Sequence, residues 1–189
     1  MRRKIVAIIG DAIIDKNGDK FKIAYEAGKA LVDNGYRVQS GGLKGIMEAA
    51  FMGAKASEKY REGDTIAILP SFDIGYANEY ADIVIPTGLD VYRNVIVANA
   101  SAVVAIGGGA GTLCEMANAW ALHRLLIGFE NVEGWSQKLA NQPVDTRNRY
   151  PSVTGDRVYG VKTAQEMIDI LNRHIDEYTI YHKGISPNS

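Results

Sequence analysis

The sequence predicts a doubly wound, Rossmann-like α/β fold, with a mostly parallel sheet of about seven strands and helices on both faces. Short runs rich in valine and isoleucine alternate with longer segments whose apolar residues recur at helical spacing, and this alternation is typical of βαβ units. Several runs lack in/out alternation, which indicates strands covered by helices on both sides. The expected strands are residues 5–9, 36–38, 65–69, 83–85, 102–106, 125–129 and 158–161.

Helical spacing and terminal signals define the segments between these strands. The first helix carries apolar residues from Phe21 to Leu31 and is expected to end at Asn34-Gly35, since glycine commonly follows a helix end. The last helix opens with a capping box, Thr163-Ala164-Gln165-Glu166, and its expected buried stripe is Met167, Ile168, Leu171 and Ile175. Further helices are expected over about 46–54, 91–100 and 112–123.

The length of 189 residues suits one substantial core, and we expect a single Rossmann-like domain over residues 1–183. Residues 184–189 are expected to form a disordered tail. One long irregular stretch, about 135–156, contains two prolines together with Arg147 and Arg149. Loops of this length in compact domains are either functional or mobile.

The composition excludes several classes of protein. With 21 Lys+Arg against 22 Asp+Glu, the net charge of −1 provides no general basic field for nucleic acid or an anionic membrane. No apolar stretch approaches the roughly 20 residues of a membrane helix, and the charged start lacks a cleavage site, so we expect a cytoplasmic location. The single cysteine, Cys114, permits no intramolecular disulfide and is expected to be buried. His123, His174 and His182 lie far apart, so no protein-built metal site is expected.

A glycine-rich turn offers the clearest functional signal. The expected strand 102–106 runs directly into Gly107-Gly108-Gly109-Ala110-Gly111-Thr112, where a helical pattern begins. Glycines allow close approach to backbone N–H groups, and a helix N-terminus favours an anion. We therefore predict a phosphate cradle formed by Gly108, Gly109, Ala110, Gly111 and Thr112. The alternative is a tight turn that only permits close helix-strand packing, and the pattern matches neither the dinucleotide fingerprint nor a P-loop.

Two further strand ends are rich in small residues. Ser40-Gly41-Gly42-Leu43-Lys44-Gly45 follows the second expected strand, and Gly10-Asp11-Ala12 follows the first. Since the carboxyl ends of parallel strands border one crevice, Gly10, Gly41 and Gly42 are predicted to join the ligand site. Lys44 is either a solvated loop lysine or a phosphate contact.

Arg93 and Glu115 are the charged candidates. Arg93 is expected in the first turn of a helix, where the macrodipole opposes a cation, so it either serves the ligand or pairs with Asp90 or Glu115. Glu115 completes a second capping-box pattern with Thr112. Beside a phosphate site, a carboxylate is otherwise useful for proton transfer, for binding a ribose hydroxyl, or for stabilising a developing cation.

At these residues the chain resembles the LONELY GUY (LOG) superfamily, also labelled "possible lysine decarboxylase", and the branch that includes molybdenum cofactor carrier proteins. The family pattern Pro-Gly-Gly-x-Gly-Thr-x-x-Glu is similar to residues 107–115, with Gly107 in place of proline. The upstream glycine motif resembles residues 40–47, and the family arginine corresponds to Arg93. The chain departs from the enzymes at Ser40, Gly107 and residues 10–13, and no lysine stands in a setting suited to pyridoxal phosphate.

The resemblance implies two main functions. As a carrier, the chain would bind a phosphorylated, nucleotide-like ligand, either molybdenum cofactor or an AMP-like nucleotide, with no tightly required cofactor. As a phosphoribohydrolase, it would cleave the N-glycosidic bond of a nucleoside 5′-monophosphate to free base and ribose 5-phosphate, with Arg93 and Glu115 as catalytic residues. A nucleotide-sensing module is a third reading. The family also implies a homodimer or homotetramer with helices at the interface.

Overall fold

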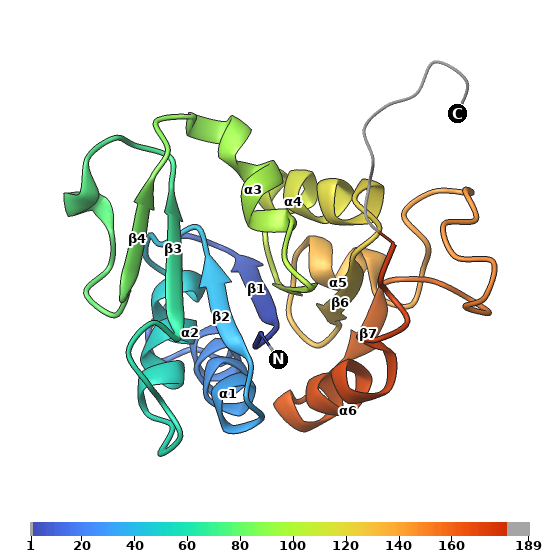
Figure 1. Cartoon of the computed structure of the whole chain (residues 1–189), viewed down its shortest axis with the longest axis horizontal. Coiled ribbons are helices and arrows are strands. Elements are labelled where there is room, and N and C mark those ends of the chain that lie inside the picture. Colours follow the sequence, from blue (N-terminus) through green and yellow to red (C-terminus); the bar gives the residue numbers. More distant parts are fainter. Residues whose placement is uncertain (1, 181–189) are drawn as a thin grey trace.

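The computed structural model describes residues 2–180 and contains one parallel sheet of seven strands (Figure 1). The strand order is β4-β3-β2-β1-β5-β6-β7, and every neighbouring pair is parallel. This confirms the predicted fold class, and each strand lies within a residue or two of its expected position. The strands are β1 (Ile5–Gly10), β2 (Arg37–Ser40), β3 (Thr65–Leu69), β4 (Ile83–Pro86), β5 (Ala102–Ile106), β6 (Leu125–Phe129) and β7 (Tyr159–Val161).

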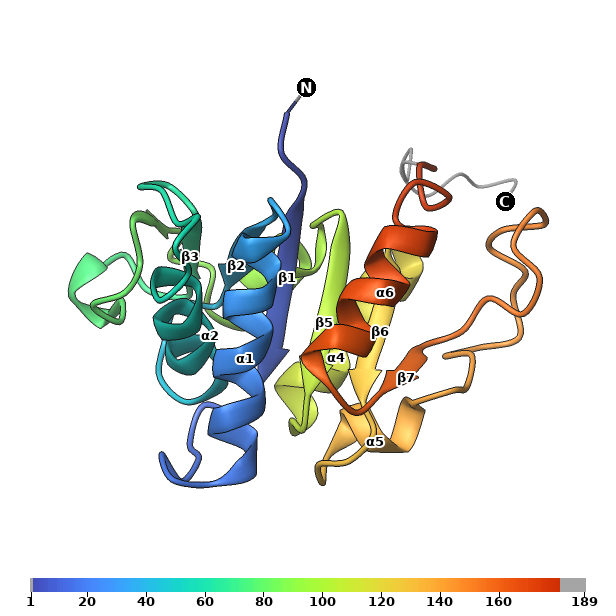
Figure 2. The ribbon, with the colours of Figure 1, turned by 90° about the horizontal axis from the view of Figure 1, so that it is seen from below.

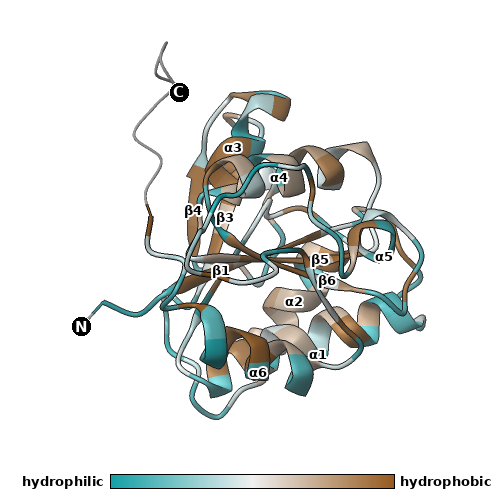
Figure 3. Ribbon diagram, turned by 90° about the vertical axis from the view of Figure 1, so that its right-hand side faces the viewer, coloured by the Kyte–Doolittle hydropathy of each residue, from teal (hydrophilic) through white to brown (hydrophobic). Residues whose placement is uncertain are grey.

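Helices cover both faces of the sheet, as Figure 3 shows, and Figure 2 looks onto one of the two helix layers. On one face, α1 (Asp19–Asp33), α2 (Ile46–Lys55) and α6 (Ala164–His174) pack against alternate strand residues such as Val6 and Val104. On the other face, α3 (Asn94–Ala98), α4 (Ala110–Ala121) and α5 (Trp135–Leu139) pack against the intervening residues, such as Ala7 and Val103. The central strands are therefore buried on both sides, which explains their continuous apolar sequence.

Three helix predictions need correction. Instead of one helix over 91–100, the chain forms a 3-10 turn, η2 (Asp90–Arg93), followed by the five-residue α3. The fourth helix begins at Ala110 rather than Thr112, because Gly109 serves as its N-cap. Of the alternatives open for Glu115, a capping box with Thr112 is therefore excluded, whereas the capping box predicted at Thr163 and Glu166 is confirmed. Helix α5 occupies the start of the stretch predicted to be irregular.

The predicted burial of Cys114 is also wrong, since this residue is exposed. Helix α4 buries the side that carries Thr112, Glu115, Met116 and Ala119, and helical spacing places Cys114 on the opposite side.

Within residues 2–180, no group of His, Cys, Asp or Glu is arranged to hold a metal ion. Over the same residues, no helix combines the length and apolarity needed to cross a membrane. The predicted tail, 184–189, and His182 lie outside the described residues.

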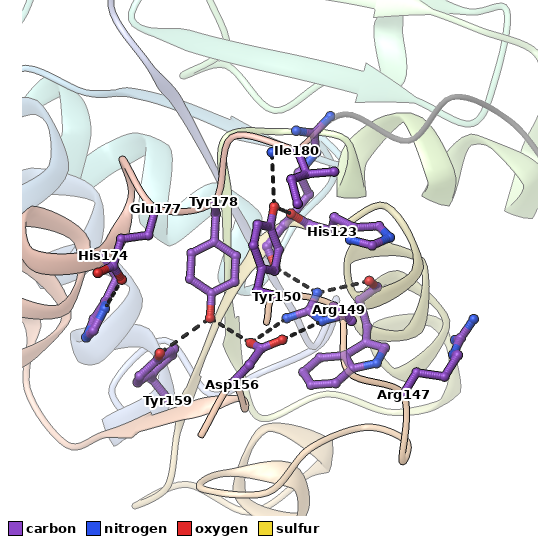
Figure 4. A network of polar contacts seen from close by, with 12 residues as sticks. His123, Arg147, Arg149, Tyr150, Asp156, Tyr159, His174, Glu177, Tyr178 and Ile180 are labelled. Atoms are coloured by element: carbon purple, nitrogen blue, oxygen red, sulfur yellow. Dashed lines mark hydrogen bonds and ion pairs between the residues drawn. The ribbon is translucent and has the colours of Figure 1, made fainter. Parts of the chain in front are cut away.

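The rest of the stretch predicted to be irregular is tied to the C-terminal end of α4 by Arg149 (Figure 4). This buried guanidinium donates to both carboxylate oxygens of Asp156, with N···O distances of 2.8 Å, and to the carbonyl of Trp120 at 2.9 Å. It also lies 3.5 Å from the centroid of the Trp120 ring. The hydroxyl of Tyr178 donates to Asp156 as well, which adds the segment after α6 to the network. Arg147, in contrast, pairs with Asp145 at the surface.

Candidate functional site

A pocket of about 260 Å³ lies where the strand order reverses, between β1 and β5. To one side of β1 the chain continues to β2 and β3, and to the other side it continues from β5 to β6. The connecting loops diverge at this point, which is where open α/β sheets bind ligands. The ends of β1, β2 and β5, helices α2 and α4, and the junction of η2 and α3 supply the lining. The lining residues are Ile9, Gly10, Asp11, Ala12, Gly41, Leu43, Met47, Arg93, Asn94, Gly109, Gly111, Thr112 and Glu115.

The glycine turn after β5 brings the N-terminus of α4 to this pocket. Gly107 and Gly108 have φ angles of +65° and +95°, which residues with a Cβ rarely adopt. The helix then starts with no side-chain cap at Gly109. A Cβ built on Gly109 or Gly111 would meet no atom within 4 Å, so both backbones border open space. The first N–H groups of α4, which lack intrahelical acceptors by their position, are therefore accessible from the pocket.

Side chains of the protein satisfy the two preceding N–H groups of the turn. The N–H of Gly107 donates to Ser136 Oγ at 2.8 Å, and the N–H of Gly108 donates to Asp11 Oδ2 at 3.0 Å. Asp11 in turn accepts from Lys20 Nζ at 2.6 Å. An anion in the pocket thus finds its backbone donors at the start of α4 rather than at Gly107 or Gly108.

The loop after β2 forms the opposite wall and holds the guanidinium of Arg93. A Cβ on Gly41 would lie 2.5 Å from Arg93 Nη2, so only glycine lets the guanidinium pack this closely on the backbone. Gly42 has a φ of +73° and donates its N–H to Ser40 Oγ at 3.1 Å, which shapes the turn. Lys44 is exposed and is not among the residues lining this pocket.

Arg93 and Glu115 form a buried ion pair at the base of the pocket. Arg93 Nη1 donates to Glu115 Oε1 at 3.1 Å, and the two residues are 8% and 7% exposed. Of the alternatives open from sequence, the partner of Arg93 is therefore Glu115. Burial raises the pKa of the Glu115 carboxyl from 4.5 to about 7, although the Arg93 charge and hydrogen bond act to lower it. Arg93 Nε is buried and has no hydrogen-bond partner within the described chain.

Most of the residues selected from the sequence thus meet at one pocket. Gly10, Gly41, Arg93, Gly109, Gly111, Thr112 and Glu115 line it, whereas Gly42, Gly108 and Ala110 belong to the same turns but are not lining residues. Sequence reasoning did not select Asp11 and Asn94, or the apolar wall of Ile9, Leu43 and Met47. Asp11 directly follows Gly10 at a strand end, so its position was a usable signal.

Comparison with known proteins places this arrangement in a family. A model of the SLOG cluster4 family matches residues 3–165. The chain belongs to the SLOG cluster4 family. This membership, together with the structural neighbours described next, confirms the resemblance to the LOG superfamily and to molybdenum cofactor carriers.

Three solved structures are similar over nearly the whole fold. The structural genomics target TM1055 is 28% identical, with a TM-score of 0.77, and the match covers 90% of this chain and 99% of that one. The molybdenum cofactor binding protein of Rippkaea orientalis is 29% identical, with a TM-score of 0.75 and coverage of 93% and 99%. The molybdenum cofactor carrier protein of Chlamydomonas reinhardtii is 25% identical, with a TM-score of 0.70 and the same coverage.

Proposed function

We propose that the chain binds a phosphorylated, nucleotide-like small molecule, of the molybdenum cofactor type, and holds it without transforming it. The observation that carries the proposal is the convergence of the α4 N-terminus and the Arg93 guanidinium on one pocket at the switch point of the sheet. Helix-end N–H groups and a cation are the donors that phosphate prefers. The similar proteins described as molybdenum cofactor binding or carrier proteins favour a ligand of that class.

In the proposed complex, the residues of the pocket supply backbone donors, a positive charge and an apolar wall. The N–H groups of Ala110, Gly111 and Thr112 donate to the phosphate, while Gly41 lets the Arg93 guanidinium pack beside the pocket. Arg93 supplies positive charge at the pocket, where its guanidinium is held by the ion pair with Glu115. Ile9, Leu43 and Met47 offer apolar contact to the ring system of the ligand.

Mass spectrometry of the small molecules released on denaturing the purified protein tests this proposal. A pterin or molybdopterin species, present in wild type and depleted in Gly111→Ala, is the expected result. The substitution places a methyl group in the open space that the phosphate would occupy, and alanine is a better helix former than glycine. Recovery of the same ligand in equal amounts from both proteins would contradict the proposed position of the phosphate.

One observation favours a second function, that of a phosphoribohydrolase. Glu115 has a pKa of about 7, close to that expected of a general acid or base at neutral pH, and it is held by Arg93 in the pocket. In that case Glu115 would stabilise an oxocarbenium-like transition state or transfer a proton to the substrate, and Arg93 would orient the substrate and the Glu115 carboxyl. Incubation with AMP, followed by detection of adenine and ribose 5-phosphate, decides between the two. Release by wild type that is lost in Glu115→Gln would establish the hydrolase and overturn the carrier.

We further propose that the chain assembles with copies of itself through an apolar face around η2 and β4. Three aromatic residues, Phe72, Tyr76 and Tyr92, are 80%, 63% and 79% exposed. At about 200 Å² for each ring, they present roughly 450 Å², more than half of the ~800 Å² that each partner contributes to a standard interface. The other exposed apolar residues of this face are Ile74, Ile83, Ile85, Leu89, Val91, Val95 and Ile96.

The face is continuous because the loops that carry it are bonded together. Phe72 packs over Gly88, and the N–H of Asp90 donates to the carbonyl of Pro70 at 3.0 Å. On edge strand β4, Ile83 and Ile85 pair in register with Ile66 and Ile68, which belong to the core cluster under α3. The isoleucines of β4 therefore point to the α3 side of the sheet, where they are 42% and 44% exposed.

Light scattering after size-exclusion chromatography tests the assembly. Wild type is expected to elute as a dimer or larger homo-oligomer, and the double variant Phe72→Glu, Tyr92→Glu as a monomer. Ile13→Glu is the control, because Ile13 is 94% exposed but lies in the loop after β1, outside this face. A monomeric wild type, or a double variant that stays oligomeric, would contradict the proposed interface.

A further inference from the structure

We propose that Asp11 is a specificity-determining residue that limits the pocket to a single phosphate group and excludes a diphosphate. The inference rests on the proposed phosphate site at the start of α4 and names the ligand class for that site. In the glycine turn after β5, protein side chains accept from the N–H groups of Gly107 and Gly108, while the N–H groups at the start of α4 face the pocket.

Asp11 occupies the part of the glycine turn that a second phosphate would need. Its Oδ2 accepts from the N–H of Gly108 at 3.0 Å and from Lys20 Nζ at 2.6 Å. A Cβ on Gly107 would lie 2.6 Å from the same oxygen, so the carboxylate is packed tightly on the turn. An internal carboxylate thus takes the place of an external anion at Gly108.

The remaining donors suffice for one phosphate. The N–H of Gly107 is bonded to Ser136 Oγ, which itself donates to the carbonyl of Phe129 at 2.7 Å. The N–H groups at the start of α4, the guanidinium of Arg93 and the side chains of Asn94 and Thr112 then line the pocket. These groups can surround the three oxygens of one terminal phosphate.

Electrostatics acts in the same direction. Asp11 lines the pocket, so a second phosphate extending toward Gly108 would meet a negative carboxylate instead of an N–H group. Lys20 Nζ lies on the same turn, since a Cβ on Gly107 would be 2.8 Å from it, and its charge is engaged in the ion pair with Asp11. Asp11 lines the phosphate pocket, whereas Lys20 is not among its lining residues. Like charges placed side by side are a common means of rejecting a wrong ligand.

Inorganic phosphate and pyrophosphate are suitable probes, because they differ in phosphate number and need no knowledge of the base or pterin. We would titrate each into ¹⁵N-labelled protein at constant ionic strength and follow the backbone amide signals. In wild type, phosphate should shift the signals of Gly109 to Thr112 and leave those of Gly107 and Gly108 in place. Pyrophosphate should bind wild type no more tightly than phosphate does, despite its greater charge.

Removing the charge of Asp11 should change this preference. Asp11→Asn keeps an oxygen that can accept from Gly108, but it no longer repels an anion and leaves Lys20 free to attract one. We expect the affinity for pyrophosphate to rise about tenfold, and that for phosphate to rise about threefold or less. Asp15→Asn is the matched control, since Asp15 is exposed in the same loop and accepts only locally, from Asn17 N. It should leave both affinities unchanged.

The outcomes separate this inference from the proposed function. If phosphate shifts no signal between Gly109 and Thr112, the proposed phosphate site fails and the role of Asp11 fails with it. If phosphate binds there but wild type prefers pyrophosphate, the phosphate site stands and the role of Asp11 is refuted. Equal gains from Asp11→Asn and Asp15→Asn would also refute it, because they would reflect net charge alone.

Discussion

Glu115→Gln should remove a pH dependence from the stability of the protein. The pKa of Glu115 is about 7 in the folded chain against an ordinary 4.5, because the carboxyl is buried. Between these two pH values the folded state binds more protons than the unfolded state, so the free energy of unfolding falls as the pH rises. A difference of about 2.5 pH units at 1.36 kcal/mol per unit corresponds to roughly 3 kcal/mol, lost between about pH 4.5 and 7. Glutamine does not titrate, and its variant lacks this loss.

Urea unfolding of both proteins at pH 5, 6, 7 and 8, followed by circular dichroism, measures the effect. Other titrating groups contribute equally to both proteins and cancel in the difference. The free energy of unfolding of Glu115→Gln, relative to wild type, should increase by most of 3 kcal/mol from pH 5 to 8, with equal m-values. Parallel stability curves would refute the reasoning, since they would mean that Glu115 titrates normally despite its burial.

Two further substitutions separate the pocket from the framework. Arg93→Met should weaken the binding of inorganic phosphate by about 10- to 100-fold, which is the loss expected for a charge-assisted hydrogen bond. Titration of phosphate against the backbone amide signals measures this affinity, and an unchanged value would assign Arg93 a structural role only. Arg149→Met should lower the free energy of unfolding by about 3 to 5 kcal/mol, since the Asp156 carboxylate, whose side chain is 9% exposed, loses its ion-pair partner and keeps the hydrogen bond from Tyr178. Arg147→Met, in the same loop but exposed, should change stability little in the same urea titration, and equal effects of the two substitutions would contradict this assignment.

Burial explains how much of the fold could be predicted from the sequence. Strands such as β1 and β5 are covered on both faces, so their apolar runs and the glycines that end them are visible locally. Helix starts near glycine are less certain. Thr112 and Glu115 carry a capping-box pattern, but the positive φ angles of Gly107 and Gly108 let α4 begin at Ala110, which places Thr112 inside the helix. Local pattern alone could not decide between these two starts.

Long-range pairing limits what could be predicted of the site. The sequence identified Arg93 and Glu115 as candidates, but their pairing spans 22 residues and depends on how α3 packs beside α4. The contact between Asp11 and Gly108 spans 97 residues and follows from the adjacency of β1 and β5 in the sheet. Such contacts leave no local periodicity, so strand order has to be known before they can be inferred.

Thermal unfolding in phosphate and in chloride, at matched ionic strength, tests the proposed phosphate site most directly. A ligand that binds the folded state raises its melting temperature, so phosphate should stabilise wild type. Gly111→Ala should be at least as stable as wild type in chloride, because its methyl group meets no atom within 4 Å, yet it should gain nothing from phosphate. Equal stabilisation of wild type and Gly111→Ala by phosphate would contradict the phosphate site at the start of α4.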